Sequence, residues 1–154
     1  MLATLAILIG ISTLFFMVIL TLIGSLNFIA LLALVIGFNL LQWLIAPYLI
    51  EALYRAKEAD ERTYGKLHAM LKRICERSRM TVPKLMVANI PIPNAFAYGS
   101  PLTGRRVAVT KELLNVLEDE EVEAVLAHEV GHLKHRDVQL MMFASVLPAI
   151  FYYI

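Results

Sequence analysis

The first fifty residues contain no charged side chain, and this feature constrains the fold more than any other. No Lys, Arg, Asp or Glu precedes Glu51, so all 14 basic and all 13 acidic residues lie in the last two thirds of the chain. Leu2–Ile23 and Leu26–Ile50 are each long enough to cross a bilayer as a helix, which takes about 20 apolar residues. Gly24 and Ser25 separate them and predict a tight turn. We therefore expect a transmembrane helical hairpin.

A cleaved signal peptide is the alternative for this segment, but the sequence argues against it. There is no basic N-terminal region, and a second apolar span follows at once. The turn carries no basic residue, whereas eight follow the second span: Arg55, Lys57, Arg62, Lys66, Lys72, Arg73, Arg77 and Arg79. By the positive-inside rule, we expect a multi-pass protein of the cell membrane whose N-terminus and residues after Ile50 are cytoplasmic.

The overall composition fits a membrane protein and gives no support to nucleic-acid binding. Hydrophobic residues make up 59% of the chain and the mean hydropathy is +0.69, above the usual range for a soluble domain. The net charge is only +1, and the sequence has no basic stripe or RNA-binding motif. The lipid bilayer is therefore the expected partner, and nucleic acid is not. The only cysteine, Cys75, excludes an internal disulfide and fits a reducing compartment.

After the apolar stretch, the chain alternates between helical and extended patterns. Glu51–Met80 has apolar residues at helical spacing with charges between them, which predicts one long helix leaving the membrane. We assign structural roles to His68 and Cys75 on this helix. The later segments predict strands at Lys84–Ala88 and Arg106–Val109, a hairpin over Asn94–Val109, a short helix from the N-cap Thr110 to Leu117, and a helix over Asp119–His135.

The last of these helices carries the pentapeptide His128-Glu129-Val130-Gly131-His132. Histidines four residues apart lie on one face of an α-helix, so both imidazoles can reach a single zinc ion. The glutamate between them can hold a water at the metal and act as its general base. Zinc lowers the pKa of such a water toward about 7, so peptide hydrolysis is the natural reaction class. The alternative is a helix that carries His and Glu on its surface by chance.

A catalytic zinc site needs three protein ligands, and the pentapeptide supplies two. The pattern with a third histidine fails, because His135 and Val138 occupy the positions that need Gly and His. His135 itself would crowd the same side of the ion. No Glu follows the pentapeptide, and Asp137 is the only acidic residue there. We therefore expect the third ligand beyond Ile154, and we expect the 154-residue chain to bind zinc poorly.

Val138–Ile154 is 17 residues long, apolar and without charge, and it predicts the start of a third transmembrane helix. We divide the chain into a transmembrane hairpin over 1–50, a partial cytoplasmic metalloprotease domain over 51–137 and the start of a third span over 138–154. The predicted fold class is a mainly α membrane protein. It combines the N-terminal hairpin with a small α+β zinc-protease domain that is incomplete at the C-terminus.

Two stretches together are more specific than the zinc motif alone, namely Pro93-Asn94-Ala95-Phe96-Ala97-Tyr98-Gly99 and Ala127-His128-Glu129-Val130-Gly131-His132. With the apolar spans, they make the chain resemble the HtpX-type integral-membrane zinc metalloproteases, relatives of the CAAX prenyl proteases. The resemblance covers essentially all 154 residues. It implies a gluzincin-like catalytic domain on the cytoplasmic face, with His128 and His132 as zinc ligands and Glu129 as base.

The resemblance also implies an edge strand that pairs with an extended substrate backbone, formed by Asn94, Ala95, Phe96, Ala97 and Tyr98. Strand addition suits peptide recognition without strict sequence demands, although the residues alone fit an ordinary hairpin equally well. Asp137 matches an acidic position of the family and would orient the site from outside the ligand shell; a plain helix-end Asp is an equal alternative. The family places a Glu ligand in a later helix, which this chain does not reach.

Two functions from different classes follow. The first is a membrane zinc endopeptidase that degrades misfolded or damaged membrane proteins, of which this chain would be an N-terminal portion with little activity of its own. That substrate class rests on the resemblance. The second is a non-catalytic membrane anchor or scaffold that kept the helix and lost the site. A downstream helix with Glu in an E-x-x-x-D setting would favour the enzyme.

Overall fold

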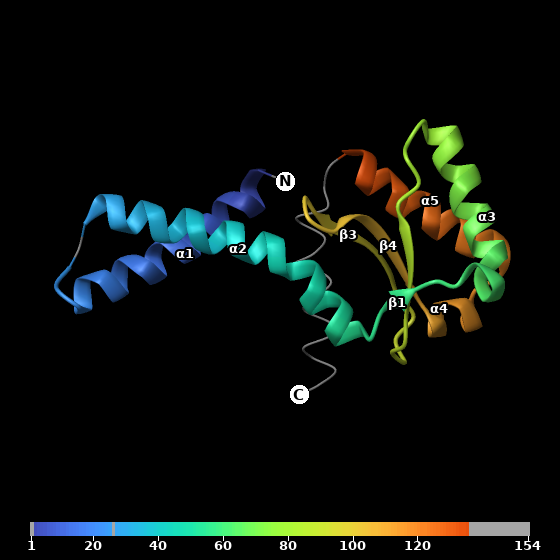
Figure 1. The fold of residues 1–154 in the computed structure, drawn as a ribbon, viewed down its shortest axis with the longest axis horizontal. Coiled ribbons are helices and arrows are strands. Elements are labelled where there is room, and N and C mark those ends of the chain that lie inside the picture. The colour runs from blue at the N-terminus through green and yellow to red at the C-terminus, as the bar shows by residue number, and fades with distance from the viewer. Residues whose placement is uncertain (1, 26, 136–154) are drawn as a thin grey trace. The chain divides into compact units, whose positions relative to one another are not determined.

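A computed structural model describes residues 2–25 and 27–135 (Figure 1). Asp137 and the predicted third span, Val138–Ile154, lie outside the described residues. Contacts divide the chain into two compact units, Met1–Ile45 and Ala46–Ile154, each with its own internal packing.

The first unit contains helix α1 (Leu2–Leu22) and most of helix α2 (Phe28–Tyr54). Asn27 precedes α2, and its side-chain oxygen accepts a hydrogen bond from the amide of Ile29 at 2.8 Å. Asn27 therefore serves as the N-cap of α2, because it satisfies an amide that has no partner within the helix.

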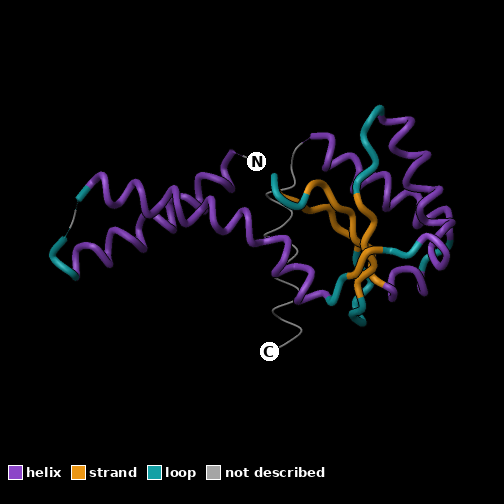
Figure 2. The backbone as a smooth tube through the Cα atoms, viewed as in Figure 1, coloured by secondary structure: helices purple, strands orange, loops and turns teal. Residues whose placement is uncertain are grey.

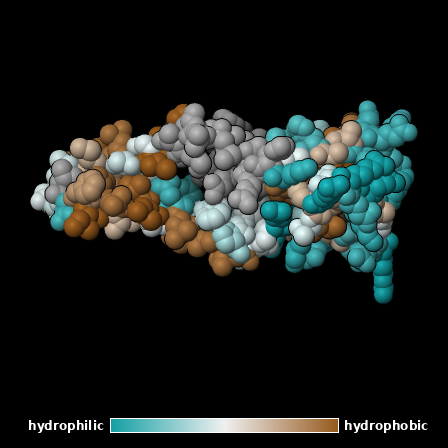
Figure 3. Space-filling model, turned by 90° about the horizontal axis from the view of Figure 1, so that it is seen from above, coloured by the Kyte–Doolittle hydropathy of each residue, from teal (hydrophilic) through white to brown (hydrophobic). Residues whose placement is uncertain are grey.

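The two helices contact each other through a polar pair and an aromatic pair. Asn39 on α2 donates a hydrogen bond to the hydroxyl of Ser12 on α1 at 2.9 Å, and the rings of Phe16 and Phe38 meet edge to face. Hydrophobic side chains make up much of the visible surface of these helices, with a few more hydrophilic ones among them (Figure 3). Within the described residues, only α2 is long and apolar enough to cross a membrane, and the apolar stretch Ile9–Leu22 is shorter. The membrane-spanning hairpin stays a prediction.

The single long helix predicted over Glu51–Met80 is wrong. Helix α2 ends at Tyr54, Arg55 adopts a left-handed φ of 49°, and the short strand β1 (Lys57–Glu58) pairs antiparallel with β2. A new helix, α3, then runs over Glu61–Ser78. The local pattern was helical, but tertiary contacts of this segment with the sheet override the propensity of its residues.

The second unit is built on a four-stranded mixed sheet in the order β1-β2-β4-β3. Strand β2 (Lys84–Ala88) runs parallel to β4 (Gly104–Thr110), and β4 pairs antiparallel with β3 (Ala95–Ser100). The predicted strands at Lys84–Ala88 and Arg106–Val109 and the hairpin between Asn94 and Val109 are confirmed. Strand β3 therefore lies at an edge of the described sheet.

Two helices follow the sheet at the predicted positions. Helix α4 spans Lys111–Val116, and the Thr110 hydroxyl accepts the amide of Leu113 at 3.2 Å, which confirms Thr110 as N-cap. Helix α5 spans Asp119–His135, as predicted. Its first turn is acidic, and negative charge there is favoured by the helix dipole.

The two faces of the sheet contact different helices. Helices α3 and α5 cover one face (Figure 2), and the core between them and the strands includes Leu67, Leu71, Ile74, Leu85, Val87, Ala97, Val107, Val109, Leu126, Val130 and Leu133. Full burial of each Leu, Ile or Val side chain in this core contributes about 1.5–3 kcal/mol. The last turns of α2 contact the opposite face, where the ring centroid of Tyr54 lies 4.6 Å from that of Phe96. Alternation along β3 sends Ala97 toward α5 and Phe96 toward α2.

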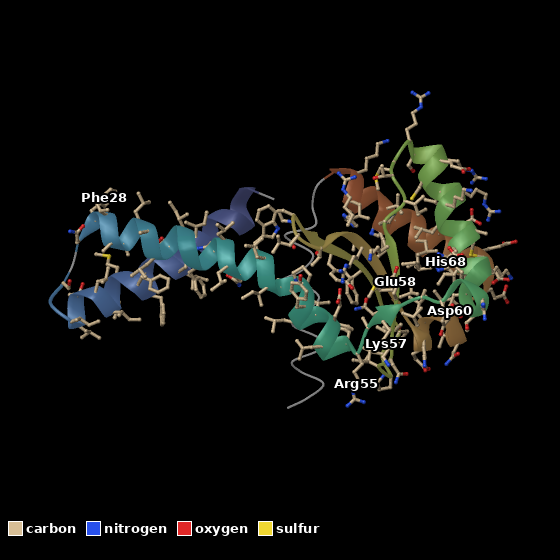
Figure 4. The ribbon with its side chains drawn as sticks, viewed as in Figure 1. Phe28, Arg55, Lys57, Glu58, Asp60 and His68 are labelled. Atoms are coloured by element: carbon tan, nitrogen blue, oxygen red, sulfur yellow. The ribbon has the colours of Figure 1, made fainter. Side chains whose placement is uncertain are left out.

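Helices α3 and α5 are also linked by ion pairs on the surface, Lys66–Asp119 and Arg73–Glu123. Exposed pairs of this kind add little stability, typically about 0–1 kcal/mol, so the apolar core dominates. His68 lies on α3 beside the segment that carries Glu58 and Asp60 (Figure 4), and its Nε2 is 2.9 Å from the carbonyl oxygen of Ala59. Cys75 is fully buried in the core.

The end of β3, just before the turn into β4, depends on Gly99. Its φ is 154°, and a Cβ at this position would lie 2.2 Å from the carbonyl oxygen of Gly104. We expect Gly99→Ala to lower the free energy of unfolding by about 1–3 kcal/mol, because backbone atoms must move to admit the methyl group. Urea unfolding of the purified protein in detergent measures this change.

Gly65→Ala is the matched control, because Gly65 lies in α3 with open space around its Cβ position. This variant should be neutral or more stable by up to about 1 kcal/mol, since alanine is the better helix former. Equal stability of the two variants would contradict the role assigned to Gly99.

Candidate active site

Helix α5 places His128 and His132 one turn apart with their imidazoles facing each other. The two Nε2 atoms are 3.1 Å apart, the ring centroids are 4.6 Å apart, and the ring planes are nearly perpendicular at 89°. His128 is exposed to solvent and His132 is half-buried. Two nitrogen donors therefore converge on one point at the surface of the helix.

The spacing of these donors fits a zinc ion. Two nitrogens bound to tetrahedral zinc at about 2.0–2.1 Å are about 3.3 Å apart, close to the observed distance. No group of three His, Cys, Asp or Glu side chains suited to a metal ion occurs among the residues that the structure describes. The His135 side chain and Asp137 lie outside the described part. The described residues therefore provide two donors of a zinc site.

Glu129 lies between the two histidines and is turned toward the protein interior. Only 5% of its surface is exposed, and this burial raises the pKa of its carboxyl group, although charges on His132 and His128 and a hydrogen bond from the Ala97 backbone act to lower it. Its Oε2 atom is buried and has no hydrogen-bond partner among the described residues. Buried polar atoms are rarely left unpaired, so this oxygen is suited to a water molecule or a cation.

The hydrogen bond to Glu129 comes from the free edge of β3. The carbonyl of Asn94 accepts the amide of Thr110 at 2.9 Å, so these opposed residues form a hydrogen-bonded pair. In an antiparallel ladder such pairs alternate, which directs the backbone groups of Phe96, Tyr98 and Ser100 toward β4. The backbone groups of Ala95, Ala97 and Gly99 therefore point outward, and the Ala97 amide meets the Glu129 carboxylate.

The structure thus brings part of the predicted substrate strand to the predicted base. Ala97 is joined to Glu129, whereas Phe96 and Tyr98 direct their side chains to the opposite face of the sheet. Substrate binding by this strand stays a prediction. Sequence reasoning missed two polar residues behind the strand, Glu51 and Arg106, which form an ion pair. The one available signal was that Glu51 is the first charge after fifty uncharged residues.

An edge strand thus lies beside a helix that carries two histidines and a buried glutamate, and the same chain contains a long apolar helix. Residues 61–154 match peptidase family M48. The chain therefore belongs to peptidase family M48.

Individual relatives agree with this assignment. The chain is 42% identical over 120 residues to a protease HtpX homolog from Thermoplasma volcanium, and the matched region covers 78% of this chain and 39% of that protein. It is 48% identical over 109 residues to a protease HtpX homolog from Aeropyrum pernix, and this match covers 71% of this chain and 34% of that protein. The chain spans less than two fifths of the length of these curated relatives.

The fold is similar to the crystal structure of Ste24p from S. mikatae. The TM-score is 0.61 at 23% sequence identity, and the match covers 98% of this chain and 36% of the other. The resemblance to HtpX-type proteases is thus confirmed. The likeness to Ste24p supports a fold of the same kind for the described helices and sheet.

The burial of Glu129 predicts a dependence of stability on pH. A raised pKa means that the folded state binds the proton of Glu129 more tightly than the unfolded state does. The ionised carboxylate therefore lowers the free energy of unfolding at pH values above the unfolded-state pKa of the group. This loss of stability disappears as the pH falls and the carboxyl group is protonated. Glutamine is neutral and still accepts the Ala97 amide. In metal-free protein we expect Glu129→Gln to raise the free energy of unfolding by about 1 kcal/mol at pH 8.

Urea unfolding in detergent with a chelator, at pH 8 and near pH 4, measures the difference between the two proteins. The difference should shrink at the lower pH, where the wild-type carboxyl group is protonated. A Glu129→Gln variant less stable than wild type at pH 8 would contradict the burial described above.

Proposed function

We propose that this chain is part of a membrane-bound zinc endopeptidase in which His128 and His132 hold the metal and Glu129 is the general base. One observation carries the proposal. Two imidazole nitrogens 3.1 Å apart lie next to a buried carboxylate that is itself anchored to the free edge of a strand. Metal donors, base and a peptide-binding edge are the three parts that peptide hydrolysis needs.

Zinc, when bound, supplies a Lewis acid that makes water available as a nucleophile at neutral pH and polarises the substrate carbonyl. The contribution of Glu129 follows from its surroundings. Burial raises its affinity for a proton, so it can accept one from water and pass it to the leaving amine. The bond from the Ala97 amide holds the carboxylate in one orientation. We propose that the third zinc ligand lies beyond Ile154, as the sequence predicts.

The substrate would be an extended polypeptide that pairs with β3. The Ala97 amide is already bonded to Glu129, so pairing would use the Ala97 carbonyl and the outward-facing groups of Ala95 and Gly99. Backbone pairing makes few demands on sequence, which suits unfolded, misfolded or damaged membrane proteins. We propose a gluzincin-like domain on the cytoplasmic side of the cell membrane in a multi-pass protein.

A non-catalytic anchor or scaffold is the other function considered from the sequence. Membership of a peptidase family and the retained geometry of His128, Glu129 and His132 speak against it.

Replacing the base should separate metal binding from catalysis. In the full-length protein, we expect Glu129→Gln to reduce cleavage of an unfolded membrane substrate by at least about 1,000-fold, because the amide cannot accept a proton from water. Zinc content, measured by mass spectrometry of the purified protein, should stay at one ion per chain. Unchanged proteolysis in this variant would refute the mechanism.

The third-ligand proposal has its own test. The 154-residue chain, equilibrated with zinc, should retain clearly less than one ion per chain after dialysis, since two histidines give a weak site. His128→Ala should reduce retention further. Tight, stoichiometric zinc in the 154-residue chain would mean that it contains a third ligand, with His135 the first residue to replace.

A further inference from the structure

The C-terminal end of α2 carries a small polar cluster that the proposed chemistry does not use. Glu51 forms an ion pair with Arg106 of β4, and the same carboxylate oxygen accepts a hydrogen bond from the Tyr98 hydroxyl of β3 at 3.0 Å. The side chains of Arg106 and Glu51 are only 14% and 20% exposed, and Tyr98 is fully buried. This contrasts with the pair Lys66–Asp119, which is 68% and 62% exposed.

The cluster joins the end of α2 to both strands of the β3–β4 hairpin at the same position along the strands. Tyr98 and Arg106 are directly opposed in the β3–β4 register, so Glu51 bridges the two strands from outside the sheet. Three residues further along α2, the ring of Tyr54 lies against Phe96, whose ring centroid is in turn 5.6 Å from that of Tyr98. Phe96 and Tyr98 thus hold one face of β3 against α2.

The residue between them faces the opposite way. Ala97 packs in the core with α5, and its amide is bonded to Glu129. Strand β3 is therefore fixed from one face by α2 and from its free edge by the helix that carries the proposed metal ligands. A shift of Tyr98 must move Ala97, because the two residues are adjacent in an extended strand.

We infer that Glu51 is a positioning residue: through its contacts with Tyr98 and Arg106, it holds the free edge of β3 in the position where an extended substrate meets Glu129. This inference rests on the proposed function, in which β3 pairs with substrate. A role in stability alone does not account for the arrangement equally well. Partly buried ion pairs often add little net stability, because desolvation offsets the attraction, and in some proteins their role is to fix the alignment of the elements that they join.

Kinetics of the full-length protein on an unfolded polypeptide test the inference. Glu51→Leu removes both contacts at similar volume, and we expect KM to rise about tenfold with kcat changed less than about twofold, because substrate alignment is lost but the base is intact. Glu51→Gln should restore most of the wild-type KM, since its amide oxygen still accepts from Tyr98 and Arg106. Tyr98→Phe should give an intermediate KM. Lys66→Gln, which breaks an exposed pair, is the matched control and should leave both constants unchanged.

A readout without catalysis separates the inference from the proposed function. In the Glu129→Gln background, hydrogen exchange of the Phe96 and Tyr98 amides should be about tenfold faster in Glu51→Leu and near normal in Glu51→Gln, because these amides bond to β4. Exchange in α5 should not change. Affinity for a fluorescein-labelled unfolded peptide, measured by anisotropy, should fall in parallel.

The outcomes are distinguishable. If wild-type protein cleaves no polypeptide, the proposed function fails, and exchange and peptide binding still decide the role of Glu51. If wild-type protein cleaves but Glu51→Leu leaves KM, β3 exchange and peptide affinity unchanged, the inference is overturned. If Glu51→Leu also speeds hydrogen exchange in α5, the milder Tyr98→Phe variant decides the question. A wild-type KM together with wild-type hydrogen exchange in β3 of that variant overturns the inference.

Discussion

The candidate site depends on the hydrogen bond between the Ala97 amide and the Glu129 carboxylate. This bond joins the edge strand of the sheet to the helix that carries His128 and His132. The carboxylate is buried at a cost in desolvation, and the bond partly offsets that cost while fixing the orientation of the side chain. The two histidines therefore lie nearer the surface, while the glutamate between them is buried and bonded to the sheet.

The surroundings of β3 explain why this bond can be kept. The strand has its small residue, Ala97, against α5 and its large aromatic residues, Phe96 and Tyr98, against the end of α2. A larger side chain at 97 would separate the strand from α5, because the core there is closely packed. The polar contacts of Glu51 fall on the opposite face. Each face of the strand thus restrains it in a different way.

Local sequence signals predicted the elements whose formation is itself local. Helix α5 was predicted at Asp119–His135 and Thr110 as a helix N-cap, because periodicity, an acidic first turn and a capping hydroxyl act within a few residues. The helix predicted over Glu51–Met80 was wrong, because β1 forms by pairing with β2, where Lys57 lies opposite Val87, thirty residues further along the chain. No local pattern within that segment reports a partner so distant.

By itself the sequence determined the chemical groups and their spacing: two histidines four residues apart, a glutamate between them, a hairpin before them and a long stretch without charge. It also supported the family to which the chain belongs. Only the tertiary structure decided which strand edge contacts Glu129. It also decided that Glu51 contacts Tyr98 and Arg106 and not the solvent. The physical reason is that strand order and register depend on contacts between residues far apart in the chain, and these contacts fix which groups become neighbours.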